Sequence, residues 1–297
     1  MVINPYGAVK NQSAMSMSRR RALAFMTSNL ALSGLGLFGV IRPAQAEITS
    51  ITTAINRAGY IRALSQQIAK AYIQIALDVI PGKSNDIIIA SQALIQRNIQ
   101  QLKMTAAPDN NRQLDGLNTQ SVALASVIAK TPSKANSLTV SLQADALLLE
   151  ADRATRFYQG LSSSSQAKVI NVAGRQRMLS QRTAKLYFLM QAGYDTKEIR
   201  SELQNSRNEF NTALDMMTGL PITTPSIKGE MELAKQQWSA FQVSLDQKPN
   251  PAMMRNVATT SERLLEVMDS LTNQYDQALK DMLGKIDQNP VTLAGMF

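Results

Sequence analysis

Two segments of the chain carry nearly the same nineteen residues, AINRAGYIRALSQQIAKAY at 54–72 and VINVAGRQRMLSQRTAKLY at 169–187. They lie 115 positions apart, and from the second residue of each segment onward eleven of eighteen aligned positions are identical. Each copy has an arginine near its centre, Arg62 in the first and Arg177 in the second. A long segment repeated at such a distance indicates an internal duplication.

Turn-rich stretches divide the rest of the chain into segments with the apolar period of an α-helix, and no segment alternates as a β-strand does. The breaks are PGKS (81–84), APDNN (107–111), TPSK (131–134), GLSSSS (160–165), GYD (193–195), GLPITTPS (219–226) and KPNP (248–251). Helix starts are indicated by the capping-box spacing of Asp195 and Glu198, and by cap residues before prolines, Thr224 with Pro225 and Asn250 with Pro251. We expect an all-α fold of eight helices, arranged as two tandem four-helix-bundle-like repeats with long antiparallel helices.

The first 46 residues have the features of an export signal rather than of a folded domain. Paired arginines in SRRRALA (18–24) precede a mildly apolar stretch at 22–41, and AQA (44–46) offers a signal-peptidase site. This combination is typical of a twin-arginine leader, with a general secretory signal or an uncleaved membrane anchor as the alternatives. We therefore expect a periplasmic mature protein that begins near Glu47.

The predicted organisation has four parts. A signal peptide at 1–46 precedes a first helical repeat at 47–160 and a second at 161–287, and a flexible C-terminal tail follows at 288–297. No further apolar run after the leader is long enough to cross a bilayer, so we expect a mature form that does not span the membrane.

Composition excludes several classes of function. The 297 residues include no Cys and no His, so Ser-His-Asp and Cys-His catalysis and thiolate or imidazole metal sites lack their residues. The net charge is +9, but the leader holds five basic and no acidic residues, which leaves 26 basic against 22 acidic residues and an ordinary surface. We expect no nucleic-acid partner, no metal or other cofactor, and no enzyme, since no convergent carboxylate pair is identified.

The identical positions follow one seam of a helix and have an unusual composition. Steps of three and four residues connect Ile55, Ala58, Arg62, Ser65, Ala69 and Tyr72 with their equivalents Ile170, Ala173, Arg177, Ser180, Ala184 and Tyr187. Small residues allow a second helix to approach closely, while burying an unpaired guanidinium group costs several kcal/mol. If the two copies pack on each other, both arginines meet and require an anion, and a small planar oxyanion suits two planar forks of donors.

A structural interpretation of the same seam stays open. Glu150 and Glu266 occupy comparable places in the fourth helix of each half, and either carboxylate is a possible partner for an arginine. The small residues would then mark close helix packing alone.

The segment INVAGRQRMLSQRTAK at 170–185 resembles the opening helix of a periplasmic sensor domain. That domain is shared by type IV pilus methyl-accepting chemotaxis transducers (PilJ-type) and nitrate/nitrite sensor kinases (NarX-like), and the first copy resembles it more weakly. The resemblance implies a four-helix bundle that dimerises, with the arginine matching Arg177 binding nitrate between the two first helices. The candidate ligand-binding residues are therefore Arg177, Arg62, Gly174, Gly59, Ser180, Ser65 and Arg182, with the glycines allowing close backbone approach.

The resemblance implies a sensor-type binding protein for a small anion such as nitrate or nitrite, which signals through a separate membrane transducer or sensor kinase. The alternative is a helical adaptor of a pilus or chemotaxis-type transducer without a small-molecule ligand. The two copies differ at Tyr60 against Arg175 and at Gln67 against Arg182, so we expect any site to be asymmetric.

Overall fold

The structure is a computed structural model that describes residues 42–105, 110–162 and 165–288, with the backbone alone at 42–50, 165–166 and 283–288. Within these residues it contains eight helices and no strand, which confirms the predicted all-α fold. The helices are α1 (Arg42–Ala76), α2 (Pro81–Lys103), α3 (Asn111–Ile128), α4 (Lys134–Gly160), α5 (Ser165–Gln191), α6 (Lys197–Thr218), α7 (Pro225–Asp246) and α8 (Pro251–Gln288).

Helix starts follow the cap chemistry of the sequence at two of the three predicted places. The side-chain oxygens of Thr224 and Asn250 accept hydrogen bonds from backbone N–H groups in the first turns of α7 and α8. The N-cap of α6 is Thr196 rather than Asp195: the Thr196 side-chain oxygen accepts from the Ile199 N–H, and the Asp195 carboxylate pairs with Arg200 at 2.6 Å.

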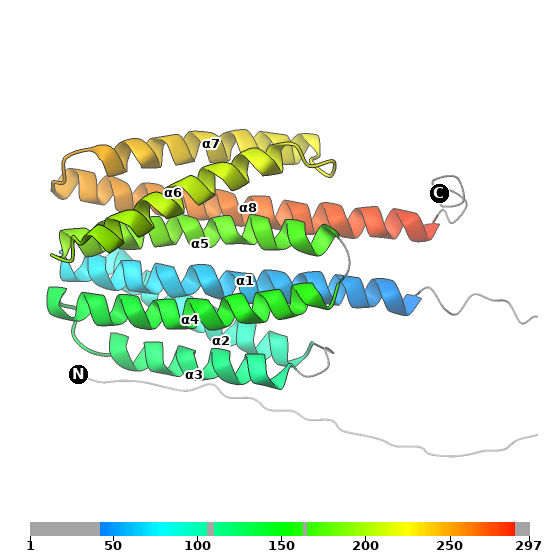
Figure 1. Ribbon diagram of the computed structural model, residues 1–297, viewed down its shortest axis with the longest axis horizontal. Coiled ribbons are helices and arrows are strands. Elements are labelled where there is room, and N and C mark those ends of the chain that lie inside the picture. The colour runs from blue at the N-terminus through cyan, green and yellow to red at the C-terminus, as the bar shows by residue number, and fades with distance from the viewer. Residues whose placement is uncertain (1–41, 106–109, 163–164, 289–297) are drawn as a thin grey trace, which may run out of the picture. The chain divides into compact units, whose positions relative to one another are not determined.

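The two helices that carry the repeated segment lie side by side, and both run in the same direction (Figure 1). Helix α4 packs on α1 and runs against it, while α8 packs on α5 in the same way. Helices α2 and α3 follow on the side of α1, and α6 and α7 on the side of α5. The repeated segment therefore lies at the centre of the described helices.

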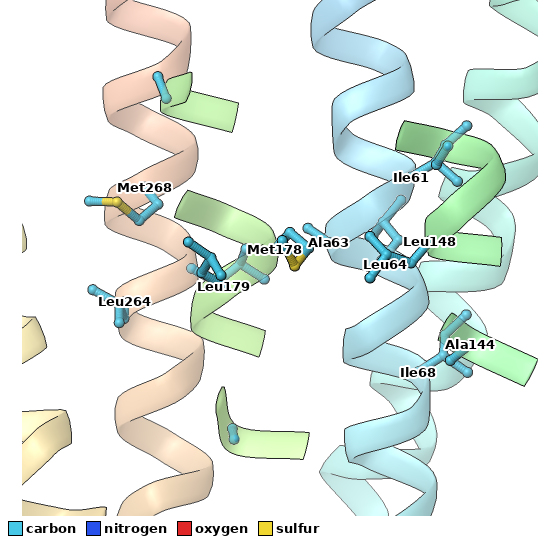
Figure 2. Packing of buried hydrophobic residues seen from close by; sticks show 14 of the residues in the cluster. Ile61, Ala63, Leu64, Ile68, Ala144, Leu148, Met178, Leu179, Leu264 and Met268 are labelled. Atoms are coloured by element: carbon cyan, nitrogen blue, oxygen red, sulfur yellow. The ribbon is translucent and has the colours of Figure 1, made fainter. Parts of the chain in front are cut away.

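The core between the central helices is aliphatic. Figure 2 shows Met178 of α5 beside Ala63 of α1, two residues from the same position of the repeated segment. A large side chain thus packs opposite a small one, which fills the space between two closely spaced helices. On the outer sides of this contact, Leu179 packs toward α8 and Leu64 toward α4, and all four side chains are 0–1 % exposed.

The predicted export signal and tail fall almost wholly outside the described residues. The paired arginines and the apolar stretch of the leader precede residue 42, and the tail at 288–297 overlaps the described chain only at Gln288. Among the described helices, none is both long and apolar enough to cross a membrane.

Candidate functional site

Both repeated arginines are buried at the contact between α1 and α5. Arg62 and Arg177 are each 1 % exposed and are the two largest fully buried side chains among the described residues. Small residues one turn away on the same faces, Gly59 and Gly174, leave room for the guanidinium groups. A buried guanidinium group needs hydrogen-bond acceptors and a counter-charge, because water no longer supplies them.

Arg62 obtains these partners from two helices. Its Nη1 donates to Asp152 Oδ1 of α4 at 2.8 Å. Its Nη2 reaches across to α5, where it donates to Asn171 Oδ1 at 2.8 Å and to the Asn171 carbonyl at 3.3 Å. One end of the guanidinium group is therefore neutralised by an ion pair, and the other end links α1 to α5.

Arg177 makes the corresponding contacts in the other direction, from α5 to α8 and to α1. Its Nη1 donates to Asp269 Oδ1 of α8 at 2.6 Å, and its Nη2 donates to Asn56 Oδ1 of α1 at 2.7 Å and to the Asn56 carbonyl at 3.4 Å. Asn56 and Asn171 are the same position of the repeated segment. The two arginines thus exchange equivalent hydrogen bonds across the α1–α5 contact.

The two guanidinium groups are brought together at Gly174. A Cβ atom at this position would lie 3.2 Å from Arg177 Nη2 and 3.8 Å from Arg62 Nη2, and one at Gly59 would lie 3.1 Å from Arg62 Nη2. The glycines therefore make room for side-chain ends, rather than for the close backbone approach that the resemblance implied.

Burial and neighbouring positive charge lower the pKa of Arg62 to about 10, against the opposing effect of Asp152. Arg177 is among the charges that lower it, which agrees with the proximity of the two groups. The Nε atoms of both arginines are buried and donate no hydrogen bond within the described part of the chain. Each guanidinium group therefore keeps at least one donor that the protein does not use there.

The counter-charges are not the predicted carboxylates. Asp152 and Asp269 pair with the arginines, whereas Glu150 pairs with the exposed Arg153. The fourth helix of each half does supply the partner, as expected, but the predicted residues Glu150 and Glu266 are wrong. The rotation of α4 and α8 about their axes determines which acidic residue faces the seam.

A second buried polar layer, which the sequence analysis missed, lies two turns further along α1 and α5. Lys70 is 0 % exposed and donates to Gln181 Oε1 at 2.7 Å, to Ser261 Oγ at 3.1 Å and to Glu262 of α8. Its contacts with α5 and α8 reach into the other half of the chain. The sequence did hold a signal for this layer, because Lys70 and Lys185 occupy the same position in the two copies of the repeated segment.

Lys185 makes the equivalent connection toward α4. It is also 0 % exposed, and its Nζ donates to both carboxylate oxygens of Asp145 at 2.7 and 2.8 Å. Burial lowers the pKa of Lys70 and of Lys185, while Glu262 and Asp145 act in the opposite direction. These ion pairs join the fourth helix of each half to the first helix of the other half.

The other predicted site residues make no hydrogen bond to the guanidinium groups of Arg62 and Arg177. Ser65 and Ser180 donate to the backbone carbonyls of Arg62 and Arg177, each at 2.8 Å. Arg182 pairs with Glu202 of α6 at 3.0 Å, on the side of α5 that faces α6. The structure therefore brings together the two arginines and the two glycines, while Arg182 belongs to a different contact.

The copies are asymmetric around the arginines, as the sequence predicted. The Tyr60 ring lies under the Arg177 guanidinium group, with 4.8 Å from Cζ to the ring centroid, which is a cation–π geometry. At the equivalent position of α5, Arg175 pairs instead with Glu209 and lies 3.7 Å from Asp152. Across the described residues, no group of three or more acidic side chains has the arrangement of a metal site.

Comparison with known proteins gives one match. No curated protein and no solved structure shows a significant match to the chain. Residues 161–263, which include all of α5, α6 and α7 and the first part of α8, match the family model for the N-terminal domain of type IV pili methyl-accepting chemotaxis transducers, PilJ. The part of the chain that carries Arg177 is therefore similar to a transducer-type signalling domain.

Proposed function

We propose that the chain is a periplasmic sensor-type signalling protein built from two copies of this domain, at 47–160 and 161–287. The exchange of equivalent Arg–Asn hydrogen bonds between α1 and α5 carries the proposal, because a twofold dimer makes its contacts in this reciprocal way. The first repeat then takes the place that a second subunit occupies in a dimer. The leader at 1–46 directs export.

The proposed ligand is a small planar anion such as nitrate or nitrite, held between Arg62 and Arg177. The two guanidinium groups approach each other at Gly174, and each has an Nε donor that binds nothing in the described chain. An anion that engages both groups competes with their bonds to Asn56 and Asn171, and so changes the contact between α1 and α5. A ligand shifts a signalling protein only through such a difference in affinity between two arrangements.

A second candidate function is a helical adaptor that binds a pilus or a membrane transducer without a small ligand. The ion pairs of Arg62 with Asp152 and of Arg177 with Asp269 favour it, because they already neutralise both guanidinium groups. In this case the polar layers serve to hold α1 and α5 in register. For the sensor function, the proposed partner is a separate membrane transducer or sensor kinase.

Thermal unfolding with and without anions separates the two functions. At about a hundred times its dissociation constant, nitrate should raise the unfolding free energy by roughly 2.7 kcal/mol. Chloride should do much less, because a spherical ion does not use a planar fork in a bidentate manner. Arg177→Lys keeps the charge but loses the fork, so it should abolish the nitrate effect, and Arg62→Lys should weaken it. A wild-type protein that responds equally to nitrate and chloride, or to neither, contradicts the anion sensor and leaves the adaptor.

A further inference from the structure

A cavity of about 370 Å³ lies between α5 and α6, and it uses residues other than the arginine pair. Its lining includes Val172, Arg175 and Gln176 from α5 and Glu209, Ala213 and Met216 from α6. A cavity of about 150 Å³ is enough to hold benzene, so this volume suits a small organic molecule.

Gln176 is the most informative residue of the lining. It is 1 % exposed, and its Nε2 donates to the Val172 carbonyl of its own helix at 3.3 Å. Its Oε1 is buried and accepts no hydrogen bond from any described residue. The equivalent residue of α1 is Ile61, which is fully buried in the core. The second copy thus has a buried acceptor where the first has an aliphatic side chain, and such an acceptor destabilises the fold unless a donor reaches it.

The lining of the cavity also carries one positive group from α5 and one negative group from α6. Arg175 holds Glu209 through both Nε and Nη2, the latter at 3.1 Å. Their side chains are 37 % and 42 % exposed, so a ligand from solvent reaches them. The equivalent of Arg175 in α1 is Tyr60, so this ion pair also belongs to the second copy alone.

The remaining lining is partly apolar. Val172, Ala213 and Met216 offer aliphatic and thioether surface beside the ion pair. A ligand with a negative charge alone is repelled here by the Glu209 carboxylate, and a ligand with a positive charge alone is repelled by the Arg175 guanidinium group. The lining therefore suits a molecule that has both charges close together and an apolar group attached to them.

We propose that this cavity binds a free amino acid with an aliphatic side chain. The ligand carboxylate binds Arg175, and its ammonium group donates to Glu209 and to the free Oε1 of Gln176. Its side chain packs on Val172, Ala213 and Met216. The site contains neither Arg62 nor Arg177, so it goes beyond the proposed function. Arg175 lies 3.7 Å from Asp152, the ion-pair partner of Arg62, so a variant at Gln176 separates the two sites more cleanly than one at Arg175.

Calorimetric titration and thermal unfolding of the full chain with L-leucine test the proposal. Three compounds dissect the ligand: 4-methylpentanoate lacks the ammonium group, 3-methylbutylamine lacks the carboxylate, and glycine lacks the side chain. L-Leucine should bind and stabilise the protein, and each of the three should bind about tenfold more weakly or worse. Equal binding of the acid or the amine, or no binding of L-leucine, overturns the proposal.

Two variants connect the binding to this cavity. Gln176→Ile introduces the residue that α1 has at the same position, so it should unfold at a higher temperature without ligand and bind L-leucine about tenfold more weakly. Arg175→Gln should also weaken binding by about tenfold or more. Arg200→Gln, in an exposed ion pair at the start of α6, is the matched control and should bind as the wild type does. Wild-type affinity in both cavity variants contradicts the assignment. A nitrate response that depends on Arg177 is unaffected by either result.

Discussion

The guanidinium group of Arg62 on α1 donates a 2.8 Å hydrogen bond to the side-chain oxygen of Asn171 on α5. The reverse bond, from Arg177 to Asn56, measures 2.7 Å and uses the same two positions of the repeated segment. The α1–α5 contact is therefore self-complementary, although both helices belong to one chain. A surface that complements itself is the kind that forms a twofold dimer.

The isolated second half should consequently dimerise. A chain of residues 161–288 exposes the face of α5 that α1 covers, and a second copy offers Asn171 to Arg177 of the first. Sedimentation velocity should show a dimer, and Asn171→Ala should weaken it, because both crossing bonds to the Asn171 side chain are lost and only those to its backbone carbonyl remain. A stable monomer at high concentration would mean that the half repacks its own polar seam.

Removing Asp152 should strongly destabilise the protein. Arg62 is 1 % exposed and Asp152 15 %, so Asp152→Ala leaves a buried guanidinium group without its carboxylate. We expect a loss of roughly 3 kcal/mol or more in the unfolding free energy, measured by urea denaturation. Glu150→Gln on the same helix is the control, because Glu150 pairs with the exposed Arg153, and it should change stability by less than about 1 kcal/mol. Similar losses in both variants would contradict the pairing that the structure assigns.

Alanine should have opposite effects at two helical glycines. Gly229 lies exposed within α7, and a Cβ atom there meets nothing within 4 Å. Gly229→Ala should therefore stabilise the protein by roughly 0.5–1 kcal/mol through helix propensity. At Gly174 the added methyl group meets Arg177 Nη2 at 3.2 Å, so the guanidinium groups must shift from their acceptors. Gly174→Ala should be at least about 1 kcal/mol less favourable than Gly229→Ala in urea denaturation. An equal gain at both positions would mean that the arginine pair is free to move.

The buried Lys185 should make stability depend on pH on the alkaline side. Burial lowers its pKa below the ordinary value of 10.5, so between the folded pKa and 10.5 the unfolded chain binds more protons than the folded protein. The unfolding free energy contributed by Lys185 should therefore rise as pH rises through that window, and should be constant below the folded pKa. Urea denaturation of the wild type and of Lys185→Met, repeated from pH 7 to about 10, measures this contribution. The unfolding free energy of the wild type should increase with pH relative to that of the variant. A difference that does not change with pH would show that Lys185 titrates alike in both states.

The proposed export by the twin-arginine route should depend on the paired arginines at 19 and 20. Replacing Arg19 and Arg20 with Lys keeps the charge of the leader, but it should block passage through the twin-arginine route and leave a stable precursor in the cytoplasm. Cell fractionation with immunoblotting measures the ratio of precursor to mature protein. Unimpaired export and processing near Ala46 would indicate the general secretory route instead.

Local sequence determined the helices because their signals act over a few residues. The turn-rich stretches separate the same eight helices that the structure contains within its described residues, and Thr224 and Asn250 cap α7 and α8 as expected. Cap assignment failed at α6, where Asp195 and Thr196 are adjacent candidates. Thr196 caps the helix and Asp195 binds Arg200, and the capping pattern alone does not distinguish two adjacent candidates.

The arginine partners were not predictable from the repeat. The arginines are 115 positions apart, but Asp152 and Asp269 are 117 apart, so the offset that aligns α1 with α5 does not align α4 with α8. Glu150 and Asp152 are separated by about 200° around a helix of 3.6 residues per turn, so the orientation of α4 decides between them. That orientation results from the packing of α4 on α1, which involves the whole length of both helices.

By itself the sequence determined the all-α fold and the repetition of one helical seam with Arg62 and Arg177 at its centre, whereas the tertiary structure decided that the two copies pack on each other and bury both arginines. The fold and the seam follow from helical period, turn residues and repetition, all of which are local or internal to the sequence. Only the tertiary structure decided that Lys70 and Lys185 pair with carboxylates of the opposite half, that Asp152 and Asp269 neutralise the arginines, and that Gln176 faces a cavity without a partner. Such relationships depend on the relative rotation and offset of helices distant in the chain, and close packing of entire helix faces fixes these quantities.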